Sequence, residues 1–447
     1  MPSNTKIQAP TLPTDGRDND GEGIATLDAR ADRRYGRATH RSRRHVLVRV
    51  VARNEPAVPG KERGPVQIGF AVDRSGSMGG GKLDMAKRAM AEALQQLLIK
   101  DSFTVVWFES QVLRMEACQR ATAAAVNATI AACQAIDTGG STALFGGWVT
   151  AAETIAAARE PDALARVLLI TDGDANQGPS EVAQLGPAAR ELREKGISTS
   201  CIGIGEGYNE ALLTAMAREG GGNDYFAAAG ADLPGIVARE LGEVKAVVAR
   251  GAVLQIRPSQ GVKVQVLSGF RNVWTGTDVH VDLGDLVSDQ ELTVALRLTL
   301  PTGAVGDKCG IECSALIGAE PALVPAQLVE FTLADGATND SQPRDQQVDR
   351  EMARQYAARA RMAAVDMNRR RRYAAAAHEL KQTAEHIAKY MGNDPELRAL
   401  VAELTQDAER MALEQDELLR KQMYTNSSYG SRSKNLDGSS RRTTDRS

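Results

Sequence analysis

Residues 66–90 of the chain read VQIGFAVDRSGSMGGGKLDMAKRAM, and this stretch decides the fold. The run Val66–Val72 is apolar enough for a buried parallel strand. After Lys82, the apolar residues Leu83, Ala86 and Met90 recur every three or four positions, which predicts a helix with one apolar face. A strand, a glycine-rich loop and a helix in this order form the first unit of a doubly wound α/β sheet.

The alternation of strands and helices continues to about residue 248. The further strands expected are Phe103–Phe108, Arg166–Thr171, Ser198–Ile204 and Asp224–Ala228. The further helices expected are Ala121–Cys133, Thr142–Ala158, Ser180–Lys195, Asn209–Arg218 and Leu233–Val248. Short β-branched runs separated by amphipathic helices are typical of a mostly parallel sheet. The sequence therefore predicts a Rossmann-like α/β domain over residues 65–248.

The flanking sequence predicts a second domain and a helical region. Six short runs of period two in residues 249–333 indicate an antiparallel β-sandwich, and a strand in residues 44–64, His45–Asn54, is expected to join it. The α/β domain would then be inserted in the sandwich. Residues 334–348 are expected to be a linker and residues 349–422 a helical region, whereas the polar segments 1–43 and 423–447 are expected to be a disordered leader and tail.

Composition limits the classes of function. The 447 residues are 43% hydrophobic and carry a net charge of only −3, so no overall field favours nucleic acid. The chain contains neither the apolar core of a signal peptide nor a run long enough to span a membrane. Five cysteines without paired spacing suit a reducing compartment. These features together predict a cytoplasmic protein.

The loop after the first strand fits two kinds of site. Gly76 to Lys82 spells G-x-x-x-x-G-K, the start of a phosphate-binding loop, but Leu83 stands where such a loop needs Ser or Thr for Mg²⁺. Asp73 to Ser77 spells D-x-S-x-S, which offers carboxylate and hydroxyl oxygens to a hard cation.

Two later loops complete a candidate metal site. One loop offers Thr142, at the start of an expected helix. Another offers Asp172, directly after the expected strand that ends at Thr171. Loops at the carboxyl ends of parallel strands converge on the crevice where open α/β sheets bind ligands. The candidate metal ligands are Asp73, Ser75, Ser77, Thr142 and Asp172.

The motifs D-x-S-x-S at 73–77, G-S-T at 140–142 and T-D-G at 171–173 resemble the metal-ion-dependent adhesion site (MIDAS) of the von Willebrand factor A superfamily. The resemblance covers the α/β domain only. It implies that Ser75, Ser77 and Thr142 give hydroxyl oxygens to Mg²⁺, or to Mn²⁺ or Ca²⁺, while Asp73 and Asp172 act mainly through water. Ser141 is a neighbour that could share the role of Thr142. In the family, an Asp or Glu of a protein partner completes the metal shell.

The expected function is therefore a non-catalytic adaptor or scaffold in a cytoplasmic complex or signalling system. All five histidines lie outside the α/β domain, so no Ser–His pair is expected near Ser75. Family precedent suggests an AAA+ ATPase of the MoxR type as partner, and Tyr424 and Tyr429 in the tail suggest a kinase or a phosphopeptide-binding protein. The alternatives are a divergent NTPase that uses Lys82, and a subunit that regulates a membrane channel or an AAA+ ATPase.

Overall fold

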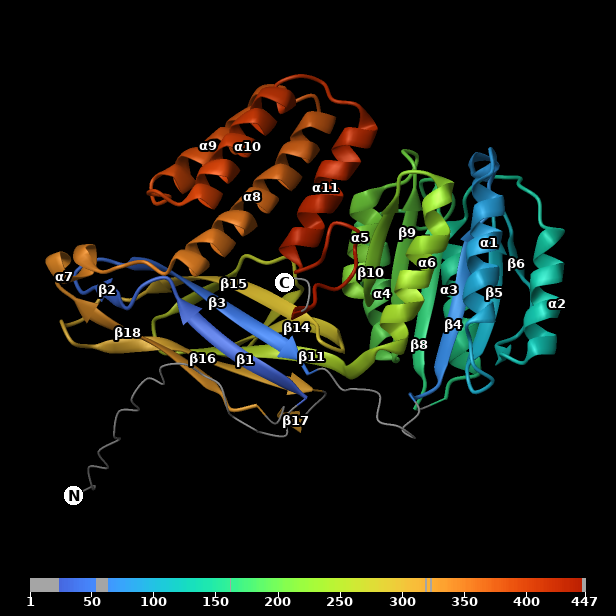
Figure 1. Cartoon of the computed structure of the whole chain (residues 1–447), viewed down its shortest axis with the longest axis horizontal. Helices are drawn as coiled ribbons and strands as arrows, with labels where there is room; N and C mark the ends of the chain where they lie inside the picture. The colour runs from blue at the N-terminus through green and yellow to red at the C-terminus, as the bar shows by residue number, and fades with distance from the viewer. Residues whose placement is uncertain (1–23, 54–62, 161, 318–319, 322–323, 444–447) are drawn as a thin grey trace.

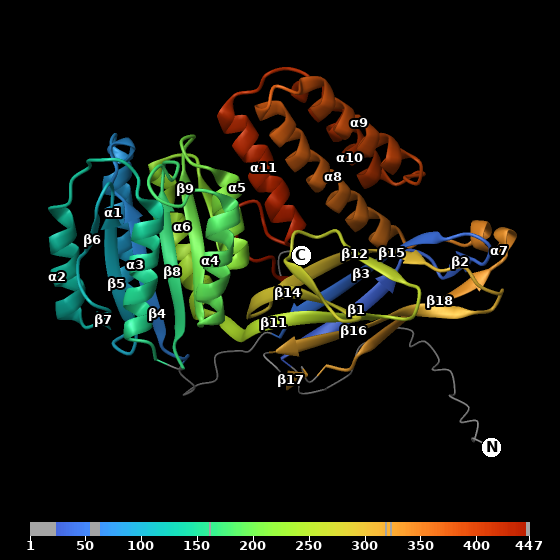
Figure 2. The same ribbon diagram turned by 180° about the vertical axis from the view of Figure 1, so that it is seen from behind.

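The structure is a computed structural model that describes residues 24–53, 63–160, 162–317, 320–321 and 324–443. It has three parts: an α/β domain, a β-sandwich and a unit of four helices (Figures 1 and 2). The helices lie above the sandwich, and the last of them runs alongside the α/β domain (Figure 1). The chain's last described residues lie between the sandwich and the α/β domain.

The α/β domain is built on one sheet with the strand order β10-β9-β8-β4-β5-β6. Its strands are β4 (Val66–Asp73), β5 (Ser102–Phe108), β6 (Val112–Arg114), β7 (Gln119–Arg120), β8 (Leu164–Thr171), β9 (Ile197–Ile204) and β10 (Gly221–Ala227). The central strand β4 pairs in parallel with β5 and β8, and every one of its residues is buried. The edge strand β6 and the short β7 pair with β5 in antiparallel fashion.

Helices cover both faces of this sheet (Figures 1 and 2). They are α1 (Lys82–Gln95), α2 (Ala123–Gln134), α3 (Leu144–Ala157), α4 (Val182–Glu194), α5 (Glu210–Glu219) and α6 (Leu233–Lys245). Side chains of α1, α2 and α6 form one hydrophobic core with the sheet, and those of α3, α4 and α5 form the other. The prediction of a doubly wound α/β fold is confirmed.

The β-sandwich consists of two sheets with the strand orders β1-β3-β15-β12 and β13-β14-β11-β16-β18-β2. Its strands are β1 (Ala25–Ala31), β2 (Tyr35–Arg37), β3 (Ser42–Ala52), β11 (Val247–Pro258), β12 (Lys263–Val266), β13 (Asn272–Thr275), β14 (Asp278–Val287), β15 (Glu291–Leu300), β16 (Lys308–Ile317), β17 (Glu320–Pro321) and β18 (Gln327–Ala334). Because β3 pairs with β15 along ten residues, the α/β domain is inserted between β3 and β11 of the sandwich, as the sequence predicts.

Helices follow the sandwich. They are α7 (Gly336–Ser341), α8 (Gln346–Arg369), α9 (Tyr373–Ala388), α10 (Pro395–Met411) and α11 (Glu417–Ser431), and we call α8 to α11 the helical unit. Alanine and leucine side chains such as Ala357, Leu380 and Leu404 form its core. The segment expected to be a linker contains the short helix α7. Across the described ranges, no helix has the length and apolar character needed to cross a membrane.

The N-terminal prediction needs correction where the structure describes that segment. Residues 24–43 are not disordered, because β1 and β2 lie in the sandwich and Leu27 is part of its core. Their polar side chains have distant partners: the Asp32 carboxylate accepts a hydrogen bond from His45 N–H at 2.9 Å. The remainder of the predicted leader, residues 1–23, lies outside the described residues.

The C-terminal prediction also needs correction. Instead of a disordered tail from residue 423, helix α11 continues to Ser431, and residues 432–443, here called the C-terminal segment, lie against both other domains. Tyr429 is 2% exposed and accepts a hydrogen bond from Phe226 N–H at 3.2 Å, so its hydroxyl is closed to a kinase in this structure. Hydrogen bonds to residues far away in sequence hold this segment, and its composition gives no sign of them.

Candidate metal centre

The five candidate ligands come together at the carboxyl edge of the α/β sheet. Asp73 is the last residue of β4, Asp172 directly follows β8, and Thr142 lies just before α3. Ser75 and Ser77 lie in the loop between β4 and α1, which includes a short 3₁₀ turn from Gly76 to Met78. The sequence separates these residues by up to 99 positions, but the parallel order of β4 and β8 places them at one edge.

Hydrogen bonds join four of the five residues. The Ser75 and Ser77 hydroxyls lie 3.0 Å apart, and the Ser77 hydroxyl donates to Asp172 Oδ1 at 2.7 Å. Ser75 N–H donates to Asp73 Oδ1 at 2.8 Å, which fixes the turn that follows β4. The cluster is well covered, since Asp73, Ser75 and Asp172 are each at most 2% exposed.

Thr142 faces the same cluster from the other side of Gly173. A Cβ placed at Gly173 would lie 3.2 Å from Thr142 Oγ1 and 3.6 Å from Ser77 Oγ. Glycine therefore keeps open a space that the two hydroxyls border. The Thr142 backbone is fixed by its N–H, which donates to Asn176 Oδ1 at 2.8 Å. Ser141 belongs to the rim, where its hydroxyl lies 3.2 Å from that of Ser110.

Backbone contacts hold the first two loops together. Gly76 N–H donates to Gly140 O at 3.3 Å, and Gly139 N–H donates to Arg74 O at 2.8 Å. Gly140 has a φ of 65°, a left-handed conformation that favours glycine, and a side chain there would collide with Glu109. The loops that carry Ser75, Ser77 and Thr142 are thus positioned by main-chain hydrogen bonds.

Burial dominates the electrostatics of Asp73. It raises the pKa of the Asp73 carboxyl to about 6, and the nearby Asp172 carboxylate acts in the same direction. Hydrogen bonds from Thr171 Oγ1, at 2.6 Å, and from Ser75 oppose this shift. An added cation would favour the charged form of both carboxylates.

Lys82 supplies a positive charge at this cluster. Its Nζ lies 2.6 Å from Asp172 Oδ2 and 3.2 Å from Ser77 O. The lysine of the G-x-x-x-x-G-K stretch therefore pairs with a carboxylate, and Leu83 after it is buried in the core. Neither residue provides the hydroxyl that a phosphate-binding loop uses for Mg²⁺.

Sequence reasoning assigned no role at this site to three residues that shape it: Thr171, Asn176 and Lys82. Thr171 and Asn176 lie in the stretch around T-D-G, so their proximity is visible in the sequence, but their hydrogen bonds to Asp73 and Thr142 are not. The sequence suggests a role for Lys82 only as the lysine of a phosphate-binding loop. Its contact with Asp172 depends on how α1 is placed over the end of β8.

The donor set fits a hard divalent cation. Three hydroxyls and two carboxylates meet at this edge of the sheet, with the Thr142 and Ser77 hydroxyls bordering the space at Gly173, and Mg²⁺ prefers such oxygen ligands together with water. Among the described residues, no group of three or more His, Cys, Asp or Glu side chains is arranged for a metal, and this donor set differs from such a group because it combines two carboxylates with three hydroxyls. The site offers few anionic ligands, so a bound cation would remain attractive to a further carboxylate.

Comparisons with known proteins identify the family of the α/β domain. Residues 67–239 match the family described as von Willebrand factor type A domain. In sequence, the chain is 24% identical over 239 residues to the uncharacterized protein YfbK of Escherichia coli, and 25% identical over 164 residues to the human inter-alpha-trypsin inhibitor heavy chain H4. These alignments cover 52% and 35% of this chain but only 41% and 18% of the two relatives.

Solved structures share the fold of most of the chain. A structure described as von Willebrand factor type A from Catenulispora acidiphila superposes with a TM-score of 0.64 at 17% identity, over 89% of this chain and 99% of that one. The ArnB paralog VWA2 from Sulfolobus acidocaldarius gives a TM-score of 0.54 at 16% identity, over 88% and 100%. At these identities the likeness concerns the fold.

Proposed function

Because residues 67–239 of this chain form a von Willebrand factor type A domain, we propose that the protein is a non-catalytic adaptor that captures an acidic residue of a protein partner through a divalent metal ion. The observation that carries the proposal is the cluster of Asp73, Ser75, Ser77 and Asp172, with Thr142 across the space beside Gly173. These five residues would hold the ion, for which Mg²⁺ is our first choice and Mn²⁺ or Ca²⁺ the alternatives.

When bound, the metal would supply an electrophilic position for an incoming Asp or Glu carboxylate. The chain's own residues prepare this position. Ser75 and Ser77 present neutral oxygens, and the hydrogen bonds from Thr171 and Ser75 orient the Asp73 carboxylate. Gly173 keeps the space between the hydroxyls open.

The connection between domains supports an adaptor role. Helix α6 ends at Lys245 and β11 of the sandwich begins at Val247, so only Ala246 separates them. A shift of α6 on partner binding would be passed directly to the sandwich. We expect the partner to belong to a cytoplasmic assembly or signalling system, with an AAA+ ATPase of the MoxR type as the first candidate. The five free cysteines, four of them buried, support a reducing compartment.

The test is metal-dependent thermal stabilisation of the full chain. Mg²⁺ or Mn²⁺ at about a hundred times its dissociation constant should stabilise the protein by about 2.7 kcal/mol. The variants Asp172→Asn and Thr142→Val should lose this stabilisation. Asp174→Asn, a matched control in the same loop whose side chain is exposed, should keep it. Equal stabilisation of all four proteins by metal would contradict the proposed ligand set.

Two further arms test the partner and the rival function. A protein captured by the wild type from a cytoplasmic extract should be released by EDTA and should not bind Asp172→Asn. The NTPase alternative instead predicts stabilisation that requires ATP and disappears in Lys82→Ala. ATP hydrolysis that depends on Lys82 would overturn the adaptor proposal.

A further inference from the structure

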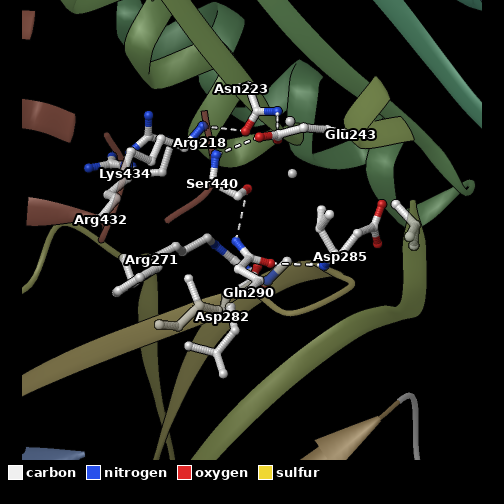
Figure 3. A pocket seen from close by; sticks show the side chains of 18 of the residues that line it. Arg218, Asn223, Glu243, Arg271, Asp282, Asp285, Gln290, Arg432, Lys434 and Ser440 are labelled. Atoms are coloured by element: carbon white, nitrogen blue, oxygen red, sulfur yellow. Dashed lines mark hydrogen bonds and ion pairs between the residues drawn. The ribbon is translucent and has the colours of Figure 1, made fainter. Parts of the chain in front are cut away.

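A polar cavity that is partly open to solvent lies between the α/β domain, the sandwich and the C-terminal segment, near the starts of β8 and β10, whereas the candidate metal centre lies at the ends of β4 and β8. Strand β10 and helix α6 border it on one side, β14 and β15 on another, and the C-terminal segment on the third (Figure 3). Its volume is about 80 Å³. Because one water needs roughly 10–15 Å³ of such space, the cavity admits a small ion with a few waters and excludes a nucleotide.

Two cationic residues of the C-terminal segment line this cavity from inside the protein. Lys434 is 9% exposed; its ammonium donates to the neutral amide oxygen of Asn223, lies 5.8 Å from the centre of the Tyr225 ring, and forms no ion pair within the described part of the chain. Arg432 is 6% exposed and pairs with Asp224, yet its buried Nε has no hydrogen-bond partner among the residues that the structure describes. Buried cationic groups without full pairing are costly and call for an anion.

The neighbouring carboxylates compensate these cations only in part, because other cations share them. Glu219 is shared by three guanidinium groups, at 2.7 Å from Arg190, 3.1 Å from Arg271 and 3.3 Å from Arg218. Burial lowers the pKa of Arg432 to about 10, and the positive charge of Arg218 contributes to this shift. Burial likewise lowers the pKa of Lys434 to about 7, with Arg432 as a further cause, although the charges of Glu243 and Glu240 oppose this shift.

The carboxylates that line the cavity already have partners. Glu243 accepts hydrogen bonds from Ser440 N–H and, at 2.9 Å, from the Asn223 amide. Asp282 pairs with Arg193 and lies 3.7 Å from Arg271. Asp285, the third acidic residue of the lining, shares the buried Arg166 with Glu240: Arg166 contacts Glu240 at 2.8 Å and Asp285 at 3.3 Å.

We propose that this cavity is a binding site for a small tetrahedral oxyanion, inorganic phosphate or sulfate, held by Arg218, Arg432 and Lys434. An anion there would give the Arg432 Nε an acceptor and Lys434 an ionic partner, and it would add negative charge beside Arg218, which shares Glu219 with two other guanidinium groups. Because two of these residues belong to the C-terminal segment, the bound anion would also fasten that segment between the α/β domain and the sandwich. The anion would thereby stabilise the junction through which α6 meets the sandwich.

The experiment is calorimetric titration of the full chain with inorganic phosphate, at pH 7 and without divalent metal, so that its result is independent of the metal site. Sulfate is the second ligand, chloride at equal ionic strength is the control salt, and AMP tests the size limit. Phosphate and sulfate should bind at one site and raise the melting temperature. Chloride and AMP should do neither.

Variants assign the site. Lys434→Met removes a buried ammonium that has no carboxylate partner, so the variant should fold, and its affinity for phosphate should fall at least about tenfold. Arg218→Gln alters an exposed residue and should weaken binding similarly. Lys263→Met, at an exposed lysine of β12, should bind as the wild type does. Absence of phosphate and sulfate binding, equal affinity in all variants, or AMP binding as tight as phosphate would overturn the proposal.

Discussion

The ammonium of Lys82 lies 2.6 Å from Asp172 Oδ2, whereas the Ser77 hydroxyl donates to the other carboxylate oxygen, Oδ1. This ion pair joins the first turn of α1 to the loop that follows β8. It neutralises one of the two carboxylates that would face a divalent metal. The positive charge therefore stabilises the loops of the metal-free protein and opposes the arrival of a cation.

Removing this charge should strengthen metal binding. Two unit charges about 4 Å apart interact with about 4 kcal/mol at an effective dielectric constant of 20, and less when one is partly exposed, as the Lys82 side chain is at 34%. We expect Lys82→Met to bind Mg²⁺ about tenfold more tightly in a calorimetric titration. Arg88→Met, on an exposed part of the same helix, is the matched control. Weaker metal binding in Lys82→Met would show that the lysine supports the site instead of opposing it.

The buried Asp73 carboxyl should make the metal-free protein sensitive to pH. Because its pKa in the folded protein is raised to about 6, its contribution to stability is fully present below the pKa of the unfolded chain and is lost as the pH rises through about 6. At pH 8 the free energy of unfolding of Asp73→Asn should therefore exceed that of the wild type by up to about 3 kcal/mol. Near pH 4 the two proteins should unfold at the same denaturant concentration.

The measurement is urea denaturation in EDTA at several pH values. Asp84→Asn changes an exposed carboxylate on α1 and should follow the wild type throughout. Adding Mg²⁺ at pH 8 should stabilise the wild type and leave Asp73→Asn unchanged. A difference between Asp73→Asn and the wild type that is constant with pH would mean that the carboxyl does not titrate in this range.

The space beside Gly173 offers a sharper test of the site. The Cβ of Gly173→Ala would lie 3.2 Å from Thr142 Oγ1 and crowd the two hydroxyls, so Mg²⁺ affinity should fall at least about tenfold while the metal-free melting temperature changes little. Gly139→Ala places a methyl group in open space in the neighbouring loop and should bind Mg²⁺ normally. The melting temperature of each variant, measured at increasing Mg²⁺ concentration, gives both its Mg²⁺ affinity and its metal-free stability. If Gly173→Ala keeps the wild-type affinity, Thr142 and Ser77 do not share an ion.

The elements that could be predicted from the sequence are those whose signal lies in their own residues. The strand expected at Arg166–Thr171 is observed as Leu164–Thr171, because a run of buried aliphatic residues marks a central parallel strand in any context. The sandwich was predictable from another local signal, the alternation of apolar and polar residues along its strands. The motif spacing likewise indicated Asp73, Ser75 and Asp172 as neighbours, since each follows a strand of one parallel sheet.

The ends of the chain were not predictable, because long-range polar contacts hold them. Ser433 Oγ accepts a hydrogen bond from Thr293 N–H at 2.9 Å, and Arg432 pairs with Asp224, more than 200 positions away. A composition of serine, arginine and glycine indicates disorder only when such partners are absent. The pairing of Lys82 with Asp172 was hidden in the same way, because it depends on the packing of α1 over the sheet.

The contact between α11 and the α/β domain yields the last prediction. Lys421 is 1% exposed; its ammonium lies 3.0 Å from Glu210 Oε2 and 4.1 Å from the centre of the Tyr208 ring. Arg369 of α8 pairs with the same Glu210, so two cations of the helical unit hold the start of α5.

Breaking this buried pair should loosen the junction. Lys421→Met leaves Glu210 with Arg369 as its ionic partner. Breaking a buried pair costs about 3–5 kcal/mol. Because Arg369 compensates in part, we expect the free energy of unfolding to fall by about 3 kcal/mol, the lower end of this range. Hydrogen exchange of residues 417–431 should accelerate accordingly, whereas Lys381→Met, at an exposed lysine of α9, should leave it unchanged. In a double-mutant cycle, Glu210→Gln should add less than its own cost to Lys421→Met, because each variant removes the same interaction. Fully additive effects would mean that α11 is docked by its apolar contacts and that the ion pair is incidental.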